Sequence, residues 1–207
     1  MKAKASQYAI IGLGRFGSSL AKELIKLGHE VLGIDKSEEI IDDLSSLLTH
    51  GVVADSTDED VLRSLGIRNF DCVVVAIGDD IQANIMTAIL LKDLGVNMVV
   101  AKALSELHAR VLDKIGIDRV IHPERDMAIR VAHQLVSPNL LDFIELSKDY
   151  TIAELSVPRH LSGVTLKDLD PRAKYGCSVV AINKNNGVII APTANDVLNE
   201  KDVMVII

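Results

Sequence analysis

The sequence predicts an α/β protein with a doubly wound parallel sheet, followed by a small α+β domain. Short apolar runs alternate with amphipathic stretches over residues 8–136. A glycine pattern follows the first apolar run, and the chain after residue 148 is rich in short strand-like segments. Strands and helices that alternate along a chain are typical of a parallel sheet covered by helices. We therefore expect one nucleotide-binding domain over residues 1–123 and a second domain over residues 149–207.

Each element of the alternation has its own signal. Strands are expected where apolar residues run together, and helices where leucine or isoleucine recurs every three or four residues. The expected strands are 8–13, 29–35, 51–55, 71–78, 97–103 and 118–123, and the expected helices are 15–28, 37–48, 57–67, 81–95 and 105–116. Ser37 is the expected N-cap of the second helix. The run 71–78 is apolar on both faces, as a central parallel strand is.

The pattern changes at Pro123, which is suited to the first position of a helix over 123–136. Residues 137–146 restart with Pro138 and are expected to form a second helix, which makes 124–148 a helical connector. In the second domain, strands are expected at 150–158, 177–183, 187–192 and 202–207. The sequence NKNNG between the middle two is typical of a hairpin turn.

Composition argues against several classes of function. The chain has 207 residues, 48% of them hydrophobic, and a formal net charge of −7, so nonspecific nucleic-acid binding is not expected. No apolar run approaches the roughly 20 residues of a membrane span. The polar first ten residues do not resemble a secretory signal. Cys72 and Cys177 lie in apolar runs and are expected to be free thiols of a cytosolic protein.

Gly12, Gly14 and Gly17 form the pattern G-x-G-x-x-G between an expected strand and an expected helix. In a Rossmann-type loop these glycines permit a tight turn, phosphate approach and close helix packing, and the helix N-terminus offers N–H groups to an anion. Asp35 ends the second strand, where an acidic residue accepts hydrogen bonds from ribose hydroxyls and disfavours the 2′-phosphate of NADP. The alternative is a plain turn with incidental glycines.

Arg15 lies inside this glycine pattern. A cation at a helix N-terminus opposes the helix dipole at a cost of about 0.3–1 kcal/mol, and a bound polyphosphate would reverse that sign. We therefore expect the Arg15 side chain to reach the terminal phosphates of a nucleotide. The alternative is an arginine that bends into solvent.

The chain closely resembles the cytosolic gating subunits of bacterial Ktr potassium-uptake systems, which carry an RCK (KTN) domain. The stretches that carry the resemblance are GLGRFGSSLAKEL (12–24), LRSLGIRNFDCVVVAIGDDIQANIMTAILLKDLGV (62–96), VLDKIGIDRVIHPERDMAIRVA (111–132) and LDPRAKYGCSVVAI (169–182). The resemblance covers essentially the whole chain. It also implies that the second domain continues a little past Ile207, so the chain could be truncated there.

The resemblance implies a nucleotide site for ATP, ADP or NAD(H) at the carboxyl ends of the strands. Its residues would be Gly12, Gly14, Arg15, Phe16, Gly17, Asp35, Lys36, Asp55, Ser56, Ile77, Gly78, Asp79, Lys102, Ala103, Leu104, His108 and Glu124. Arg15 and His108 would lie at the phosphates, Asp35 at the ribose, and Asp55 with Ser56 at the base. A divalent or monovalent cation would lie between subunits at Glu124, shared with ligand phosphates or a second copy because one carboxylate makes no strong metal site.

Several of these residues have a structural alternative. Asp55 could cap a helix that starts near Thr57. Lys102 could be a solvated strand end, and His108 an ordinary exposed helix residue. Glu124 could simply complement the dipole of the helix that it begins.

The resemblance also implies cyclic di-AMP binding in the second domain, as in some family members. The matching positions are Leu166, Asp170, Arg172, Ala173 and Pro192, and Pro171 could stiffen that loop. Dimers through the helical connector, assembled into an octameric ring, are the implied assembly. The apolar residues Ile129, Ala132, Leu135 and Val136 suit such a contact, although they could equally be internal core.

Three functions follow as hypotheses. The first is a nucleotide-sensing regulatory ring, cytoplasmic and peripheral to the inner face of the cell membrane. It would gate a membrane potassium-translocating subunit, with ATP activating and ADP inactivating. The second is an NAD-dependent oxidoreductase, which needs an acid or base facing the nicotinamide; His160 has no evident carboxylate partner. The third is a sensor in transcription or metabolism, which lacks a helix-turn-helix and a basic surface. We favour the first hypothesis, which is not enzymatic.

Overall fold

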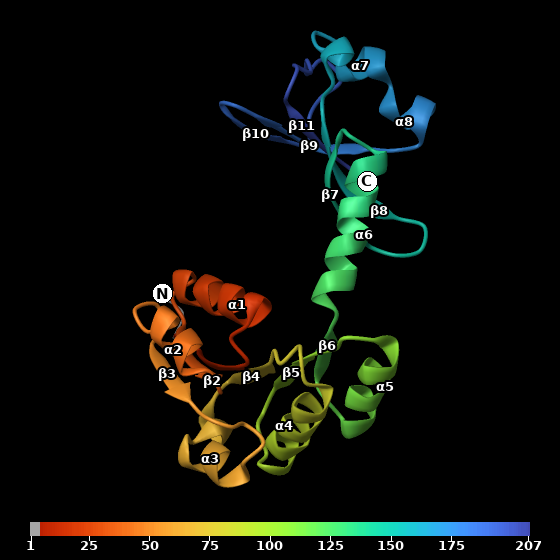
Figure 1. Cartoon of the computed structure of the whole chain (residues 1–207). Coiled ribbons are helices and arrows are strands. Elements are labelled where there is room, and N and C mark those ends of the chain that lie inside the picture. The colour runs from red at the N-terminus through yellow and green to blue at the C-terminus, as the bar shows by residue number, and fades with distance from the viewer. Residues whose placement is uncertain (1–4) are drawn as a thin grey trace. The chain divides into compact units, whose positions relative to one another are not determined.

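A computed structural model describes residues 5–207 of the chain (Figure 1). The chain divides into two compact units, Met1–Pro123 and Glu124–Ile207, and each is described by itself. Residues 1–4, which begin the polar segment predicted not to be a secretory signal, lie outside the described residues. No helix within residues 5–207 combines the length and the apolar character that crossing a membrane requires.

The first unit is built on a six-stranded parallel sheet. Its strands are β1 (Gln7–Ile11), β2 (Glu30–Asp35), β3 (His50–Val53), β4 (Cys72–Val75), β5 (Val99–Lys102) and β6 (Arg119–Ile121). They lie in the order β3-β2-β1-β4-β5-β6, and every neighbouring pair is parallel. This order is that of a Rossmann-type sheet, so the predicted fold class is confirmed. The strand order reverses between β1 and β4, which defines the switch point of the sheet.

Helices cover both faces of this sheet (Figure 1). They are α1 (Arg15–Lys26), α2 (Glu38–Leu44), α3 (Glu59–Ser64), α4 (Ile81–Asp93) and α5 (Glu106–Ile115), with a 3₁₀ turn, η1 (Ile67–Asn69), after α3. One apolar cluster joins the sheet to α1 and α2, and another joins it to α3, α4 and α5. Val73 and Val75 belong to the second cluster and Val74 to the first, so β4 is apolar on both faces as predicted.

The helix starts in this unit follow local sequence. The hydroxyl of Ser37 accepts a hydrogen bond from the backbone N–H of Ile40, which confirms it as the N-cap of α2. Asp80 caps α4 and Ser105 caps α5 in the same way. Such caps satisfy N–H groups that have no partner inside the helix and contribute about 0.5–2 kcal/mol each. They therefore set where each helix begins at the edge of the sheet.

The second unit contains a five-stranded antiparallel sheet in the order β10-β9-β11-β8-β7. Its strands are β7 (Leu140–Glu145), β8 (Thr151–Ser156), β9 (Val179–Lys184), β10 (Gly187–Ile190) and β11 (Val203–Ile206), and its helices are α6 (Pro123–Val136), α7 (Leu166–Leu169) and α8 (Pro171–Tyr175), with a 3₁₀ turn, η2 (Arg159–Leu161). Lys184 pairs with Gly187 across a two-residue turn, so the predicted hairpin is confirmed. A small core gathers around the fully buried Ile182 and Leu198.

The second predicted helix of the connector is wrong. Residues 137–146 form strand β7 instead, after α6 has ended at Val136. The strand pairs with β8, where Phe143 lies opposite Ala153 and Ile144 opposite Ile152. β-Branched and aromatic side chains suit such a pleated surface, and a partner strand satisfies the backbone groups that a short helix leaves open. The predicted helical connector 124–148 is therefore helical only as far as Val136.

Candidate functional site

The loops after β1, β2, β4 and β5 meet at one edge of the first sheet, because the strands are parallel. This edge contains the glycine-rich loop after β1 and lies beside the switch point between β1 and β4. Ligands of doubly wound sheets bind in the crevice outside the carboxyl ends of the strands. The candidate site is therefore built here, residue by residue.

Two of the three motif glycines are required by the protein itself. Gly12 has a φ of +89°, and a Cβ atom there would lie 2.8 Å from the backbone nitrogen of Ile77. A Cβ atom on Gly17 would overlap the carbonyl oxygen of Gly12. These glycines let α1 start directly against the sheet, as the motif predicts.

Gly14 differs from the other two, because neither its backbone nor its surroundings within residues 5–207 require a glycine. Its φ is −59°, and apart from its two chain neighbours no described atom lies within 4 Å of the position that a Cβ atom would take. It is the N-cap of α1 and supplies no side chain to the first-turn N–H groups. Those N–H groups have no partner inside the helix. Gly14 therefore leaves open space in front of N–H groups that suit an anion.

Arg15 is the first residue of α1 and its side chain is exposed. Within residues 5–207 no carboxylate forms an ion pair with it. Its carbonyl oxygen accepts a hydrogen bond from the hydroxyl of Ser19, at 2.8 Å. A cation is thus held at the positive end of the helix beside the space that Gly14 leaves. The exposed guanidinium is compatible both with a solvated arginine and with a contact to phosphate.

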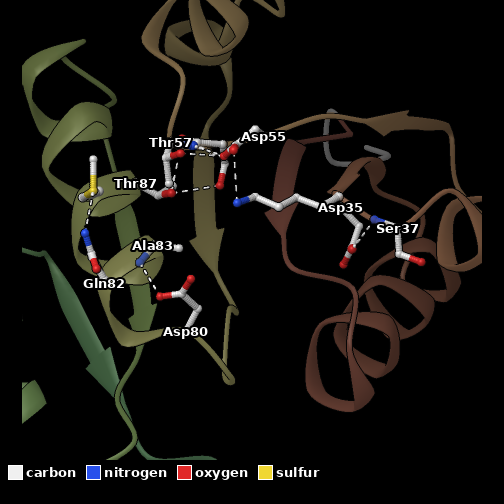
Figure 2. A network of polar contacts seen from close by, with 11 residues as sticks. Asp35, Ser37, Asp55, Thr57, Asp80, Gln82, Ala83 and Thr87 are labelled. Carbon is white, nitrogen blue, oxygen red and sulfur yellow. Dashed lines mark hydrogen bonds and ion pairs between the residues drawn. The ribbon is translucent and has the colours of Figure 1, made fainter.

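Asp35 joins the glycine-rich loop to the turn after β2. One carboxylate oxygen accepts a hydrogen bond from the backbone N–H of Leu13 at 2.7 Å. The other accepts one from the N–H of Ser37 at 2.9 Å, as Figure 2 shows. Each carboxylate oxygen has two lone pairs, so both oxygens can still accept a hydrogen bond from a ribose hydroxyl. Asp35 is therefore a structural brace as well as a candidate ribose contact.

Lys36 and Asp55 connect the ends of β2 and β3. The ammonium of Lys36 lies 3.1 Å from the Asp55 carboxylate (Figure 2). The hydroxyl and backbone N–H of Thr57 also donate to Asp55, and these hydrogen bonds, with Lys36, lower the pKa of its carboxyl group. The alternative role of Asp55 as a helix cap is wrong, because Asp58 caps α3.

Ser56 is buried, unlike its neighbours in sequence. Its hydroxyl lies 2.8 Å from the hydroxyl of Thr87 on α4, and the Thr87 hydroxyl also donates to the Ser56 carbonyl oxygen at 3.2 Å. The Ser56 side chain is thus engaged inside the protein and does not line the edge of the sheet.

Lys102 ends β5 and is 7% exposed. The alternative prediction, that it is a solvated residue at the strand end, is therefore wrong. Its ammonium nitrogen lies 6.0 Å from the centre of the Phe16 ring, in the glycine-rich loop. A Cβ atom on Gly78 would lie 3.1 Å from the same nitrogen. The side chain therefore reaches from β5 past the loop after β4 to the glycine-rich loop, and it brings three predicted site segments together.

His108 lies on α5 and is 3% exposed. The alternative prediction, that it is an ordinary exposed helix residue, is therefore wrong. Its Nδ1 accepts a hydrogen bond from the backbone N–H of Leu104, at 3.3 Å. Its Nε2 is buried without a hydrogen-bond partner in the part of the chain described. Burial lowers the pKa of His108, and the nearby His122 lowers it further. The imidazole thus supports the turn after β5, where Ala103 is also buried.

Sequence reasoning assigned no role to Asn84, although it is fully buried on α4. Its side-chain amide donates to the carbonyl oxygens of Ile77 at 2.8 Å and of Lys102 at 3.1 Å. The signal that could have found it is a pair of polar residues, Asn84 and Thr87, on a side of α4 whose other buried residues are apolar. Asp79, two residues after Ile77, is exposed at the same edge.

Glu124 lies in the first turn of α6 and is exposed. Across residues 5–207 no three His, Cys, Asp or Glu side chains are grouped so that they could hold a metal ion. A cation at Glu124 therefore stays a prediction, which requires other groups to share the ion. The helix-dipole alternative fits the position of Glu124 equally well.

The predicted positions in the second unit lie around α7 and α8. Leu166 begins α7 and is buried, and its backbone N–H donates to the carbonyl of Asp196. Asp170 has a φ of +45° and caps α8 by accepting from the N–H of Ala173. The guanidinium of Arg172 donates to the hydroxyl of Ser178 at 3.1 Å.

Pro171, Pro192 and the two cysteines make no contact that identifies a ligand site among the described residues. Pro171 is the first residue of α8, where its fixed φ suits a helix start. Pro192 lies two residues after the end of β10 and is half-buried. Cys72 and Cys177 are both free, and burial raises the pKa of the Cys72 thiol, which lowers its reactivity.

Comparison with known proteins covers both units. The TrkA-N domain family matches residues 8–123, and the TrkA-C domain family matches residues 151–207. Ktr system potassium uptake protein C of Bacillus subtilis (strain 168) is 48% identical over 201 residues, which are 97% of this chain and 91% of the relative. Ktr system potassium uptake protein A of Vibrio alginolyticus is 36% identical over all of this chain and 94% of the relative.

Solved structures share the fold. The RCK domain of GsuK aligns over 99% of this chain and 44% of that chain, with a TM-score of 0.57 and 24% sequence identity. At that identity the similarity supports the fold alone. It is the similarity to the two curated potassium uptake proteins, over nearly their whole length, that relates the chain to a family.

Proposed function

The chain belongs to the Ktr family of potassium uptake proteins as a regulatory RCK subunit with a TrkA-N and a TrkA-C domain, and we propose that it senses adenine nucleotides. ATP bound at the edge of the first sheet activates a membrane potassium-translocating subunit, and ADP holds that subunit inactive. NAD(H) competes for the same site. The oxidoreductase alternative has no support from the two Bacillus subtilis relatives, which are potassium uptake proteins.

One observation carries this proposal: the open space at Gly14, with Arg15 beside it. Apart from its two chain neighbours, no described residue has an atom within 4 Å of the position that a Gly14 Cβ atom would take. An exposed cation without an ion pair among residues 5–207 lies at its rim. A helix N-terminus and a guanidinium both attract phosphate, and together they suit a chain of phosphates better than either does alone.

The same observation suggests how ATP and ADP are told apart. A nucleotide shifts a conformational equilibrium only by the difference in its affinity for the two states. Both nucleotides would place their first phosphates at the helix, whereas only the γ-phosphate of ATP would extend to the Arg15 guanidinium. Arg15 is therefore the residue through which the number of phosphates changes the state of the subunit.

The proposal assigns the near end of the site to adenosine. Asp35 accepts hydrogen bonds from the ribose, and Lys36, Asp55 and the backbone at Ser56 lie toward the base. The negative charge of Asp35 disfavours a 2′-phosphate, so NAD(H) is preferred to NADP(H). Phe16, Ile77, Gly78, Asp79, Lys102, Ala103, Leu104 and His108 form or support the far end, where Lys102 is the buried cation nearest the glycine-rich loop.

We further propose that copies of the chain form dimers that assemble into an octameric ring, cytoplasmic and peripheral to the inner face of the cell membrane. No residue of α6 is buried in the described chain. Its apolar residues Ile129, Leu135 and Val136 are exposed and lie outside the core cluster of the second unit. They are the candidate contact between copies. A cation bound at Glu124 would be shared between two copies or with the ligand phosphates.

The second domain is proposed to bind cyclic di-AMP near α8. Arg172 is exposed and held by Ser178, so its remaining N–H groups are oriented toward solvent without being used up. Arginine in this setting suits a phosphodiester. Leu166, Asp170, Ala173 and Pro192 are the other positions assigned to this site.

The test is calorimetric titration of the full chain with ATP, ADP, NADH and cyclic di-AMP, with mass measurement of the assembly. Potassium flux through vesicles that contain the membrane subunit is then measured with ATP and with ADP. We expect an oligomer that binds ATP and ADP and activates flux only with ATP. A monomer that binds none of these nucleotides would overturn the proposal.

A further inference from the structure

Helix α4 carries two fully buried polar side chains on its inner side, Asn84 and Thr87, each with no exposed surface. They are three residues apart and therefore adjacent on one side of the helix. Burying a polar side chain costs free energy unless its hydrogen bonds are satisfied, and the amide oxygen of Asn84 is buried without a partner among residues 5–207, so this position has a cost. What these two side chains contact thus indicates why helix α4 carries them.

Thr87 contacts the loop after β3. Its hydroxyl lies 2.8 Å from the Ser56 hydroxyl and donates to the Ser56 carbonyl oxygen at 3.2 Å (Figure 2). Ser56 directly follows Asp55, which is paired with Lys36 at the end of β2. Thr87 thus holds the segment to which the proposed function assigns the adenosine half of the ligand.

Asn84 contacts the loops after β4 and β5. Its amide nitrogen donates to the carbonyl oxygens of both Ile77 and Lys102. Two carbonyl oxygens can only accept, so the orientation of the amide is fixed by its neighbours. Ile77 precedes Gly78, and the Lys102 ammonium lies beside Gly78 and the Phe16 ring. Asn84 thus holds the segment that faces the phosphate half.

We propose that α4 is the brace of the candidate nucleotide site, with Thr87 positioning the adenosine half and Asn84 positioning the phosphate half. This inference rests on the proposed nucleotide function. Neither residue touches the ligand; each acts through the backbone of a loop. A single helix thereby fixes the distance between the two halves of the site. Nucleotides with different numbers of phosphates would contact the phosphate half to different extents.

The inference predicts a difference between two variants. Asn84→Ala removes both hydrogen bonds to the phosphate half, and Thr87→Val removes the hydroxyl while keeping the shape of the side chain. We expect Asn84→Ala to lower the affinity for ADP and ATP about tenfold, as loss of buried hydrogen bonds does, and that for AMP less than about twofold. We expect Thr87→Val to lower the affinity for AMP, ADP and ATP by one common factor, because all three share adenosine.

Calorimetric titration of the full chain with AMP, ADP and ATP measures these affinities. Thr87→Ser is the matched control: it keeps the hydroxyl and is expected to bind like the wild type. A purely structural role would weaken all three ligands equally in both variants. If Asn84→Ala lowers the three affinities by the same factor, or lowers none, the inference is wrong. A wild-type chain that binds no nucleotide instead overturns the proposed function.

Hydrogen exchange on the unmodified chain tests the inference without relying on the folding of a variant. We expect AMP to protect backbone amides at 54–57, and ATP to protect those amides together with 77–79 and 102–104. Protection of all three segments by AMP to the same degree as by ATP would show that the two halves are not positioned separately.

Discussion

The carboxylate of Asp35 accepts a hydrogen bond from the backbone N–H of Leu13, 2.7 Å away across two neighbouring strands. Leu13 lies between the first two glycines of the motif, so the residue assigned to the ribose also holds the loop assigned to the phosphates. Its second oxygen holds the N–H of Ser37 at the start of α2. Asp35 therefore stabilises the folded chain through its own hydrogen bonds, independently of any ligand.

Asp35→Asn tests this dual role. The amide has one oxygen for two N–H donors, and its NH₂ group cannot accept the second bond, so a half-buried donor loses its partner. We expect the variant to lose about 1 kcal/mol of unfolding free energy, the low end for an unsatisfied donor because water can reach it in part, and to bind ATP more weakly. Denaturant unfolding and calorimetry measure the two effects. Lys36→Ala, one residue away on the surface, should change unfolding much less; equal losses in the two variants would contradict the assignment.

The glycines of the motif are expected to separate into two kinds. Gly14→Ala should fold with a melting temperature within a few degrees of the wild type, because its φ is ordinary and no atom lies near the new methyl group. It should lose most of its ATP affinity, because the methyl group enters the space left for phosphate. Gly17→Ala should instead fail to fold stably, since its Cβ atom would overlap the Gly12 carbonyl. Circular dichroism and calorimetry distinguish these outcomes. A Gly14→Ala chain that binds ATP normally would contradict the phosphate assignment.

Arg15→Ala is expected to remove the difference between ATP and ADP in potassium flux while keeping part of the nucleotide affinity. The helix N-terminus and Lys102 remain to bind the first phosphates, whereas the contact proposed for the γ-phosphate is lost. Flux through vesicles with the membrane subunit, measured with each nucleotide, tests this. Lys22→Ala, which removes another exposed cation of α1, is the control and should behave like the wild type. A normal ATP response in Arg15→Ala would show that the role belongs to another residue.

Stability at low pH should report on Asp118. The backbone N–H of Val99 donates to this carboxylate, which lowers its pKa, and Lys92 lowers it further. A carboxyl group with a lowered folded-state pKa stabilises the protein above its unfolded pKa of about 3.9, and that contribution is lost as pH falls through the folded value. We expect Asp118→Asn to melt below the wild type at pH 7, with the difference shrinking as pH falls below about 4.

Melting curves followed by circular dichroism between pH 7 and pH 3.5 measure this dependence. Asp93→Asn, at the exposed end of α4, is the control and should show no comparable difference at pH 7. If the difference between Asp118→Asn and the wild type stayed constant across this range, the hydrogen-bonded carboxylate would not be its source.

Most of the first unit could be predicted from local sequence because its signals are local. Apolar runs on both faces, such as Val73–Val75 in β4, mark central parallel strands, and residues such as Ser37 mark helix starts. The failure at 137–146 has a different cause. The apolar spacing there suits a helix or a strand, and pairing with β8, whose residues lie later in the chain, decides between them. Pairing of that kind cannot be read from one segment.

By itself, the sequence determined the fold class of the first unit, the glycine turn between β1 and α1 and the family of the chain. Short-range rules suffice for these, because a motif and its flanking strand and helix are contiguous. Only the tertiary structure decided which polar residues are buried. In the folded chain the Lys102 ammonium lies near the Phe16 ring, and both carboxylate oxygens of Asp35 accept backbone hydrogen bonds. The Asn84 amide donates to two carbonyl oxygens. Burial depends on which strands become neighbours, and the order of strands is a property of the whole sheet.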